Sequence, residues 1–248
     1  MAIRVISMAP LKGGSTKTST SLQLLAFHAM KKKKCLAIDL DAQKNLSKFL
    51  EQEEDESEHN IYDLIVGNEK ARYAIKESKF KNIDYVPGSH RLGERGVYVD
   101  EITLKEIVGS VSDIYDYVVI DNAPTLTSGA ISSFVASDAI IVTTELDKFS
   151  FQNIVRMINS IIEYNGDAEI FITPAKAITN SKAHKQLRGE LEDFVKDVDY
   201  LHLTDSIPFS VEMTNRLLDN QILIQHKALS KSHRNLKRAL EKLAKEVK

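Results

Sequence analysis

Cysteine is almost absent from this chain of 248 residues, which contains only Cys35. A single cysteine excludes a disulfide framework within the chain and any cysteine cluster for metal or iron–sulfur chemistry that the chain holds alone. The sequence also lacks a run of about 18 apolar residues, so we expect no membrane-spanning helix. No basic start followed by an apolar stretch opens the sequence, so we expect no signal peptide. These absences favour a protein of the reducing cytoplasm.

An excess of charge of one sign is also missing, because the formal net charge is -2. The distribution of charge is less even. Residues 170–248 contain 14 Lys and Arg against 10 Asp and Glu, whereas the rest of the chain carries a balance of -6. We therefore expect the C-terminal third to present a basic face on an otherwise acidic protein.

Apolar runs alternate with helical patterns along the whole chain. Apolar residues make up 43% of the sequence, which is enough for a substantial core. This alternation predicts an α/β fold in one domain, residues 1–248: a mostly parallel sheet covered by helices on both faces. We expect strands at 3–9, 35–40, 139–145 and 169–174, a strand with its turn at 83–88, and a strand within 115–124 that ends on Asp121. We expect helices at 17–31, 61–67, 69–77, 101–111, 150–164, 181–198 and 231–247.

The turn after the first expected strand reads PLKGGSTKTST, residues 10–20. The common phosphate-binding pattern is G-x-x-x-x-G-K-[ST]. Lys17 and Thr18 fit its last two positions, but Leu11 and Thr16 stand where glycine is usual. One interpretation is an ordinary turn between a strand and a helix. The other is a phosphate site, because a helix N-terminus presents unpaired N–H groups and a positive dipole end.

Acidic residues follow two of the expected strands. Asp121 ends the apolar run VVI, and Asp39 and Asp41 close the segment LAIDLD. Asp39 and Asp41 are two positions apart, so they lie on the same side of an extended chain. Ligands of open α/β sheets bind beyond the carboxyl ends of the strands. Asp121 is therefore a candidate acid for a magnesium site, the alternative being an aspartate that caps a helix or a turn.

Three segments together resemble the nucleotide-site motifs of ParA-type ATPases. These segments are KGGSTKTS, AIDLDAQKNLS and YDYVVIDNAP, in that order and at similar spacing. ParA-type proteins are P-loop NTPases with a deviant Walker A motif, and they segregate plasmids and chromosomes. Late in the chain, DSIPFSVEMTNRLLDNQILIQH resembles the family's segment near the nucleotide base, and LKRALEKLAKEV resembles its final helix. The resemblance thus covers nearly the whole chain.

The resemblance implies a role for each matching position. Lys12 would be the signature lysine that reaches the partner's phosphates across an ATP-sandwiched homodimer. Lys17 would hold the β- and γ-phosphates, and Asp41 would orient the attacking water, so these three residues are the candidate catalytic set. ATP and Mg²⁺ are the implied cofactors. The implied metal-binding residues are Thr18, Asp39 and Asp121, and the implied nucleotide-binding residues are Gly13, Gly14, Ser15, Thr16, Lys17, Thr18, Ser19 and Pro208.

One position departs from the family pattern. The family has Gly where this chain has Thr16, whereas Ser19 is an accepted residue at its position. If the loop requires a positive φ at Thr16, a β-branched residue there costs on the order of 1–3 kcal/mol. The expected activity is slow ATP hydrolysis, as in proteins that act as timers. A non-hydrolysing, nucleotide-dependent dimerisation switch is the alternative.

The resemblance also implies two partners. ParA-like dimers bind DNA without sequence preference, and a centromere-binding partner protein stimulates their hydrolysis. The first expected strand begins at residue 3, which resembles the short forms without an N-terminal helix-turn-helix. We therefore expect a cytoplasmic, nucleoid-associated protein. Ordinary solvated side chains are the alternative for the candidate DNA-binding residues, which are Lys182, Lys185, Arg188, Arg216, Lys227, Lys231, Arg234 and Lys237.

A MinD-type ATPase is the closest alternative, because it shares the nucleotide motifs but binds a membrane through a C-terminal amphipathic helix. The last expected helix here does carry a narrow apolar face, formed by Leu236, Leu240, Leu243 and Val247. That helix contains neither Phe nor Trp for a membrane interface. We therefore expect it to be a packed structural helix, and we expect no membrane partner.

Overall fold

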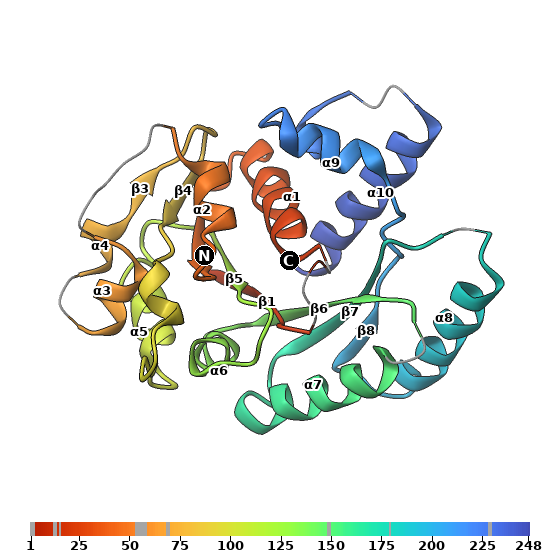
Figure 1. The fold of residues 1–248 in the computed structure, drawn as a ribbon, viewed down its shortest axis with the longest axis horizontal. Coiled ribbons are helices and arrows are strands. Elements are labelled where there is room, and N and C mark those ends of the chain that lie inside the picture. The colour runs from red at the N-terminus through yellow and green to blue at the C-terminus, as the bar shows by residue number, and fades with distance from the viewer. Residues whose placement is uncertain are drawn as a thin grey trace.

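The structure is a computed structural model, and it describes residues 3–11, 14, 16–52, 59–67, 70–147, 150–178, 180–227 and 230–248. Strands and helices alternate along the chain, as Figure 1 shows. The strands are β1 (Arg4–Met8), β2 (Cys35–Leu40), β3 (Lys76–Glu77), β4 (Ile83–Val86), β5 (Tyr117–Asn122), β6 (Ala139–Glu145), β7 (Glu169–Ala175) and β8 (Leu201–Leu203).

The helices connect these strands and cover the sheet. They are α1 (Lys17–Met30), α2 (Asn45–Leu50), α3 (Ile61–Ile65), α4 (Ala71–Ala74), α5 (Thr103–Gly109), α6 (Ser128–Val135), α7 (Ser150–Tyr164), α8 (Lys182–Val195), α9 (Val211–Leu218) and α10 (Lys231–Glu246), with short 3₁₀ turns η1 (His90–Gly93) and η2 (Leu223–Gln225).

All of these strands belong to one sheet, in the order β3-β4-β2-β5-β1-β6-β7-β8. Every neighbouring pair is parallel except β3 with β4. The expected α/β fold with a mostly parallel sheet is therefore confirmed. Because β1 lies between β5 and β6, the turn that follows β1 opens at the middle of the sheet, beside the carboxyl ends of β5 and β2.

Both faces of the sheet are buried, because successive strand residues point to opposite sides. Ile6 and Val119 pack with α1, α9 and α10 on one face, whereas Val5 and Val118 pack with α3, α4 and α5 on the other. Ile140 contributes to a further cluster with α7 and α8. Figure 1 shows α1, α9 and α10 above the strands, α7 and α8 below them, and α3, α4 and α5 at the left. The near-continuous apolar strands follow from this double cover.

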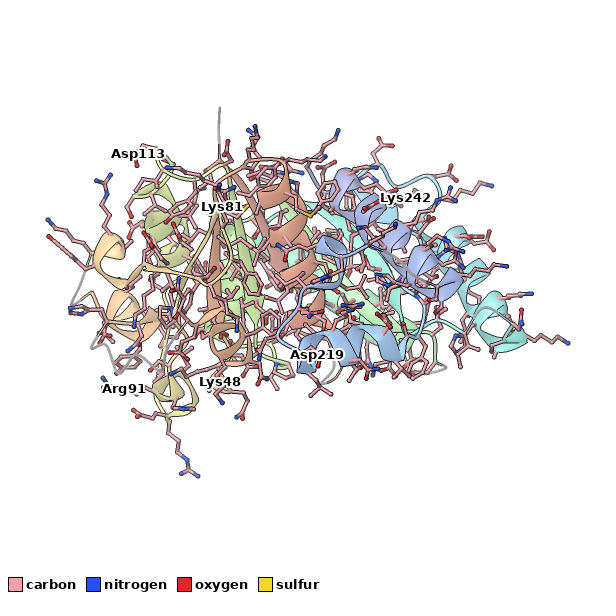
Figure 2. The ribbon with its side chains drawn as sticks, turned by 90° about the horizontal axis from the view of Figure 1, so that it is seen from above. Lys48, Lys81, Arg91, Asp113, Asp219 and Lys242 are labelled. Atoms are coloured by element: carbon pink, nitrogen blue, oxygen red, sulfur yellow. The ribbon has the colours of Figure 1, made fainter. Side chains whose placement is uncertain are left out.

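The ends of the parallel strands divide the molecule into two sides: the carboxyl edge, at which these strands end, and the opposite edge, at which they begin. Lys48 and Arg91 follow the carboxyl ends of β2 and β4, whereas Lys81 and Asp113 precede β4 and β5. Figure 2 places the first pair on one edge of the molecule and the second pair on the opposite edge. The carboxyl edge holds the candidate site.

The last helix is packed into the core. Leu236, Leu240, Leu243 and Val247 of the α10 segment are at most 1% exposed and lie in the same cluster as the apolar residues of α1. The expected packed structural helix is therefore confirmed. In the described part of the chain, no helix has both the length and the apolar character needed to cross a membrane.

One expected helix is wrong in its second half. Within 70–77, the described part of the expected segment 69–77, Ala71–Ala74 are helical and Lys76–Glu77 form β3 instead. Backbone pairing of Lys76 with Tyr85 and of Glu77 with Asp84 adds this short strand to the edge of the sheet. Sequence patterns cannot detect such a strand, because two residues show no periodicity.

Candidate functional site

Gly14 and Thr16, in the turn between β1 and α1, both have left-handed backbone. Gly14 has a φ of +74°, and Thr16, which precedes the first residue of α1, has a φ of 71° and a ψ of 13°. Lys12, Gly13 and Ser15 lie outside the described residues. α1 is a helix of 14 residues, so it has a substantial dipole. The positive end of this dipole and the unpaired N–H groups of the first helical turn point toward the loop between β1 and α1. This geometry suits an anion.

Thr16 has the positive φ at which a β-branched residue was expected to be strained. The left-handed conformation is free of steric cost for glycine, but it costs a β-branched residue on the order of 1–3 kcal/mol. Its hydroxyl Oγ1 is buried and has no hydrogen-bond partner in the described part of the chain. Thr16 therefore keeps the backbone shape for which the family uses glycine, and it does so under strain.

The first turn of α1 contacts Asp121 at the end of β5. Thr18 Oγ1 donates a hydrogen bond of 2.6 Å to Asp121 Oδ2, and Ser21 Oγ donates one of 3.2 Å to Oδ1. Ser19 is half-buried on the same turn. These contacts bring Thr18 and Asp121 together, as the two motifs predict. Ser21 was not predicted, although it lies one helical turn after Lys17 and so on the same side of α1.

Lys17 is the buried cation of this site, with an exposed fraction of 7%. Burial lowers the pKa of its ammonium group, because a low-dielectric environment disfavours the charge. The carboxylates of Asp121 and Asp41 act in the opposite direction and favour the charged form. The structure thus places Lys17 within the electrostatic reach of both predicted acids.

Asp121 and Asp39 form a buried pair of acids. They are register partners on the neighbouring strands β5 and β2, and each is 1% exposed. Burial, and after it the negative charge of Asp39, raises the pKa of Asp121 to about 7, against the hydrogen bonds from Thr18 and Ser21 and the charge of Lys17. Two adjacent carboxylates without a bound cation repel each other, so this pair fits a positively charged ligand.

Asp39 also holds the segment that follows β2. Its Oδ2 accepts hydrogen bonds from Ser47 Oγ at 2.6 Å and from Ser47 N at 2.9 Å, and its Oδ1 accepts one from Asp41 N at 3.1 Å. Gly88 N donates to Ser47 Oγ at 2.8 Å. A Cβ atom on Gly88 would lie 3.1 Å from Asp39 Cγ. Asp39 therefore fixes the position of Asp41, while Ser47 and Gly88 are supporting residues that sequence reasoning missed.

Asp41 lies at the surface end of this arrangement and is half-buried. Its Oδ1 accepts a hydrogen bond of 2.9 Å from Gln43 N, and its charge favours the protonated form of Lys17. Among the described residues, no group of three or more His, Cys, Asp or Glu side chains is arranged to hold a metal ion.

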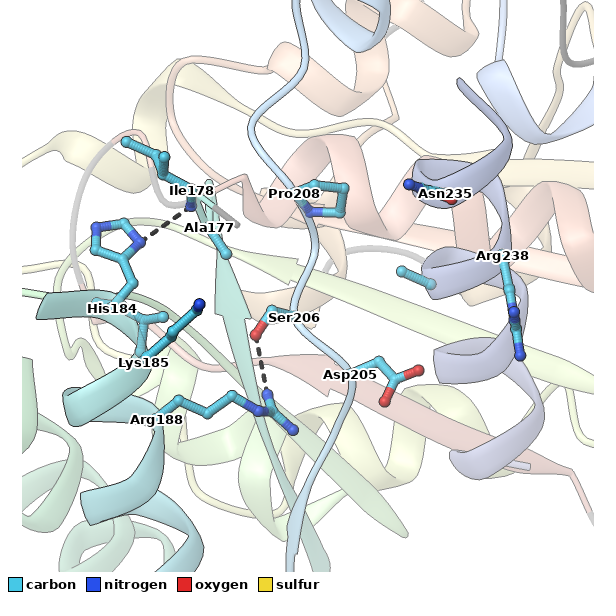
Figure 3. A pocket seen from close by; sticks show the side chains of 12 residues that line it. Ala177, Ile178, His184, Lys185, Arg188, Asp205, Ser206, Pro208, Asn235 and Arg238 are labelled. Carbon is cyan, nitrogen blue, oxygen red and sulfur yellow. Dashed lines mark hydrogen bonds between the residues drawn. The ribbon is translucent and has the colours of Figure 1, made fainter. Parts of the chain in front are cut away.

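Pro208 lines a pocket of about 430 Å³ near the carboxyl ends of β6, β7 and β8. A backbone bridge joins Pro208 to Ala177, which follows β7. Figure 3 shows the lining residues, with Arg188 donating to Ser206 Oγ at 2.9 Å and Ile178 N donating to His184 Nδ1 at 3.0 Å. Pro208 thus lies at the same edge of the sheet as the turn after β1.

The candidate DNA-binding residues fall into two groups. Arg188 bonds to Thr204 O and Ser206, Arg216 bonds to Glu212, and Lys237 donates to His226 O, so internal contacts hold these three side chains. The remaining candidates are exposed on or near α8 and α10; they are Lys182, Lys185, Lys227, Lys231 and Arg234. Five of the eight candidates are therefore exposed, and DNA binding by any of the eight stays a prediction.

Comparison with known proteins identifies relatives of this chain. The sequence model of the AAA domain family matches residues 3–172. The sporulation initiation inhibitor protein Soj of Bacillus subtilis is 28% identical over 163 residues, which is 64% of this chain and 64% of that protein. The match to a Pseudomonas putida protein likewise covers 62% of that relative's length, so the chain matches less than two thirds of these curated relatives.

Solved structures share the fold over nearly the whole chain. Apo McdA from Cyanothece has a TM-score of 0.85 at 22% identity and covers 99% of both chains. A putative plasmid partition protein from Borrelia burgdorferi, bound to AMPPNP, has a TM-score of 0.80 at 21% identity and covers 98% of this chain and 99% of that one.

Thr16→Gly should stabilise the protein, because glycine removes the strain of the left-handed backbone and an unpaired buried hydroxyl. We expect the free energy of unfolding to rise by about 1 kcal/mol, measured by urea denaturation. Thr16→Ala is the control, because alanine lacks the hydroxyl but is still disfavoured at a φ of 71°. A Thr16→Gly variant no more stable than Thr16→Ala would show that the backbone of Thr16 is not strained.

Asp121→Asn should remove a pH dependence of stability. The pKa of Asp121 is raised from 3.8 to about 7, so between these values the folded chain binds more protons than the unfolded chain. The contribution of the protonated carboxyl is present below the lower value and is lost as the pH rises through the upper one. We expect the stability of the unsubstituted protein to fall by up to about 1.4 kcal/mol per pH unit in this window.

The measurement is urea unfolding between about pH 4.5 and 7.5, with a chelator and without nucleotide. The slope should be smaller in Asp121→Asn and unchanged in Asp113→Asn, a substitution of an exposed acid on the opposite edge of the sheet. Equal slopes in all three proteins would contradict the raised pKa.

Proposed function

The chain belongs to the AAA domain family, as a ParA-type member, and from this premise we propose that it is an ATP-dependent DNA partition protein. The observation that carries the proposal is the contact of Thr18, at the start of α1, with the buried Asp121 at the end of β5. A phosphate-binding helix start beside a buried acid is the arrangement that P-loop NTPases use for a nucleotide and its metal ion. We propose that the whole chain, residues 1–248, acts as one such domain.

The residues present fit ATP with Mg²⁺. Magnesium prefers oxygen ligands, keeps several waters, and is held by one or two protein groups together with the substrate's phosphates. Thr18 Oγ1 and the Asp121 carboxylate supply such groups, 2.6 Å apart. The adjacent buried acids Asp39 and Asp121 supply the negative charge that a divalent cation neutralises. When bound, the metal ion would neutralise the charge on the phosphates.

The chain's own residues would divide the remaining work. Lys17, directed by the first turn of α1, would neutralise the β- and γ-phosphates. Asp41 would orient the attacking water, since its backbone is fixed by Asp39 and its charge faces the buried lysine. Lys12 remains the proposed contact to the partner's phosphates in a sandwich dimer. Phosphoryl transfer of this kind depends on positioning and charge neutralisation, and slow turnover suits a timing function.

Exposed apolar side chains support an ATP-dependent homodimer. Leu126, Ile178, Phe209 and Val211 are 44%, 57%, 61% and 59% exposed and lie in the loops or helix starts after β5, β7 and β8. These segments share the carboxyl edge of the sheet with the turn between β1 and α1, residues 9–16, which we call the phosphate turn. Burial of such side chains between two copies is favourable, and a nucleotide between the copies would link dimer formation to ATP.

The exposed basic residues near α8 and α10 support non-specific DNA binding by that dimer. Lysine and arginine side chains bind DNA phosphates by displacing counterions, which requires no sequence recognition. Lys227, Lys231 and Arg234 lie close together in the sequence at the start of α10 and are exposed. A separate centromere-binding protein would stimulate hydrolysis and release the DNA, and the protein would be associated with the nucleoid.

Two other functions were considered. A MinD-type membrane association through the last helix is not favoured, because its apolar residues are already buried against α1. A switch that binds nucleotide without hydrolysing it is favoured by one observation, the strained Thr16 in the phosphate turn. Measured turnover of the unsubstituted protein separates this switch from an ATPase.

Lys17→Ala should abolish ATP binding and ATP-dependent DNA association, because it removes the buried cation of the site.

Asp41→Ala should retain ATP binding and dimerisation but lose turnover. Fluorescent-nucleotide titration, light scattering and phosphate release measure these properties, with Lys81→Ala on the opposite edge as the control. DNA binding that persists without ATP and in Lys17→Ala would overturn the proposed dependence of DNA binding on ATP. Normal turnover in Asp41→Ala would reject the role of that residue.

The double substitution Lys231→Ala and Arg234→Ala should weaken DNA binding in ATP without changing nucleotide affinity. The slope of log K against log salt should become shallower by about 2 for each protomer of the dimer that contacts the DNA, since each lost phosphate contact removes about 0.9. Filter binding at several salt concentrations measures the slope. The control pair is Lys81→Ala with Lys105→Ala, which removes the same charge from other exposed positions. An equal loss in both pairs would show that net charge, rather than this face, determines binding.

A further inference from the structure

An ion pair lies beside the phosphate turn and has no role in the arrangement described so far. Lys176 directly follows β7, and Glu145 is the last residue of the neighbouring strand β6. Lys176 Nζ lies 2.8 Å from Glu145 Oε1, and the two side chains are 39% and 28% exposed. An ion pair with this much exposure adds little to stability.

The position of the Lys176 ammonium group is unusual. A Cβ atom built on Gly14 would lie 3.8 Å from Lys176 Nζ, and this is the one contact that such an atom would make among the described residues. The ammonium group therefore lies on the side of Gly14 on which a side chain would project, beside the turn after β1. Backbone N–H groups of such turns cradle phosphates, so a bound phosphate would bring its oxygens close to Nζ.

The backbone holds Lys176 in this place at some cost. Its φ is 53°, in the left-handed region that glycine favours. The following residue, Ala177, is fixed by a 3.0 Å hydrogen bond from its N–H to Ile207 O and by one from Phe209 N to its carbonyl oxygen. Left-handed backbone at a non-glycine residue is retained where the surrounding structure enforces it, which is common at ligand-binding sites.

We propose that Lys176 is a third basic residue of the nucleotide site, binding a phosphate group of the nucleotide in the same chain. The proposal rests on the proposed function and adds a phosphate contact from β7 to those from the β1–α1 turn. The ion pair with Glu145 holds the ammonium group beside Gly14. The flexible side chain of lysine then allows Nζ to move from the carboxylate to a phosphate oxygen.

The test is the affinity of the protein for ATP, ADP and AMP, measured by isothermal titration calorimetry with Mg²⁺. Lys176→Gln should bind ATP and ADP about 5- to 20-fold more weakly, because a charge-assisted hydrogen bond is lost, and should lose less affinity for AMP. Lys176→Arg should retain most of the affinity. Lys176→Gly is the second neutral variant, because glycine suits a φ of 53° and protects the fold.

The control is Lys33→Gln, which breaks an ion pair of the same 2.8 Å length with Asp116, on the segments before β2 and β5. It should bind all three nucleotides as the unsubstituted protein does. Unchanged ATP affinity in Lys176→Gln and Lys176→Gly would overturn the role of Lys176 and leave the proposed function intact. An unsubstituted protein that binds no ATP would instead overturn the proposed function, and the role of Lys176 with it.

Discussion

The buried carboxylate of Asp121 is the interaction on which the rest of the site depends. It joins the end of β5 to the first turn of α1 through the hydroxyls of Thr18 and Ser21. It also lies in register with Asp39, whose own hydrogen bonds fix Asp41 and Ser47. A single buried group thus sets the positions of the helix start and of the second acid, at the cost of repulsion between two carboxylates that a cation would relieve.

The order of the strands makes this arrangement possible. Because β1 lies between β5 and β6 with β2 beyond β5, the turn after β1 has the strands that carry Asp121 and Asp39 on one side. On its other side are β6, which ends at Glu145, and β7, which Lys176 follows. The paired carboxylates of Asp39 and Asp121 therefore approach the turn from one side, and the Lys176 ammonium group approaches it from the other. The same chain topology thus provides both a place for a metal ion and a place for the negative charge of phosphates.

Sequence reasoning predicted the features with strong patterns and missed those with weak ones. The apolar runs that became β1, β2, β5 and β6 and the long helices α1 and α10 were visible because burial on two faces or on one helix face leaves a regular signal. The strand β3 and the supporting residues Ser47 and Gly88 were not, because two residues show no periodicity and hydrogen bonds between distant segments leave none. Lys176 was missed for the same reason, since its contact is with Gly14, far away in the sequence.

Strain in the backbone connects these observations. Thr16, Lys44 and Lys176 have left-handed backbone, and they follow or adjoin the carboxyl ends of β1, β2 and β7. Glycine at any of these positions would be conformationally easier, so local preference does not explain the residues that occupy them. At Lys176 the side chain contributes a charge that glycine lacks, whereas the Thr16 hydroxyl makes no hydrogen bond among the described residues that could offset the cost. In the proposed site, a bound phosphate would therefore give Lys176 a further partner, whereas the same phosphate would have to fit beside the side chain of Thr16.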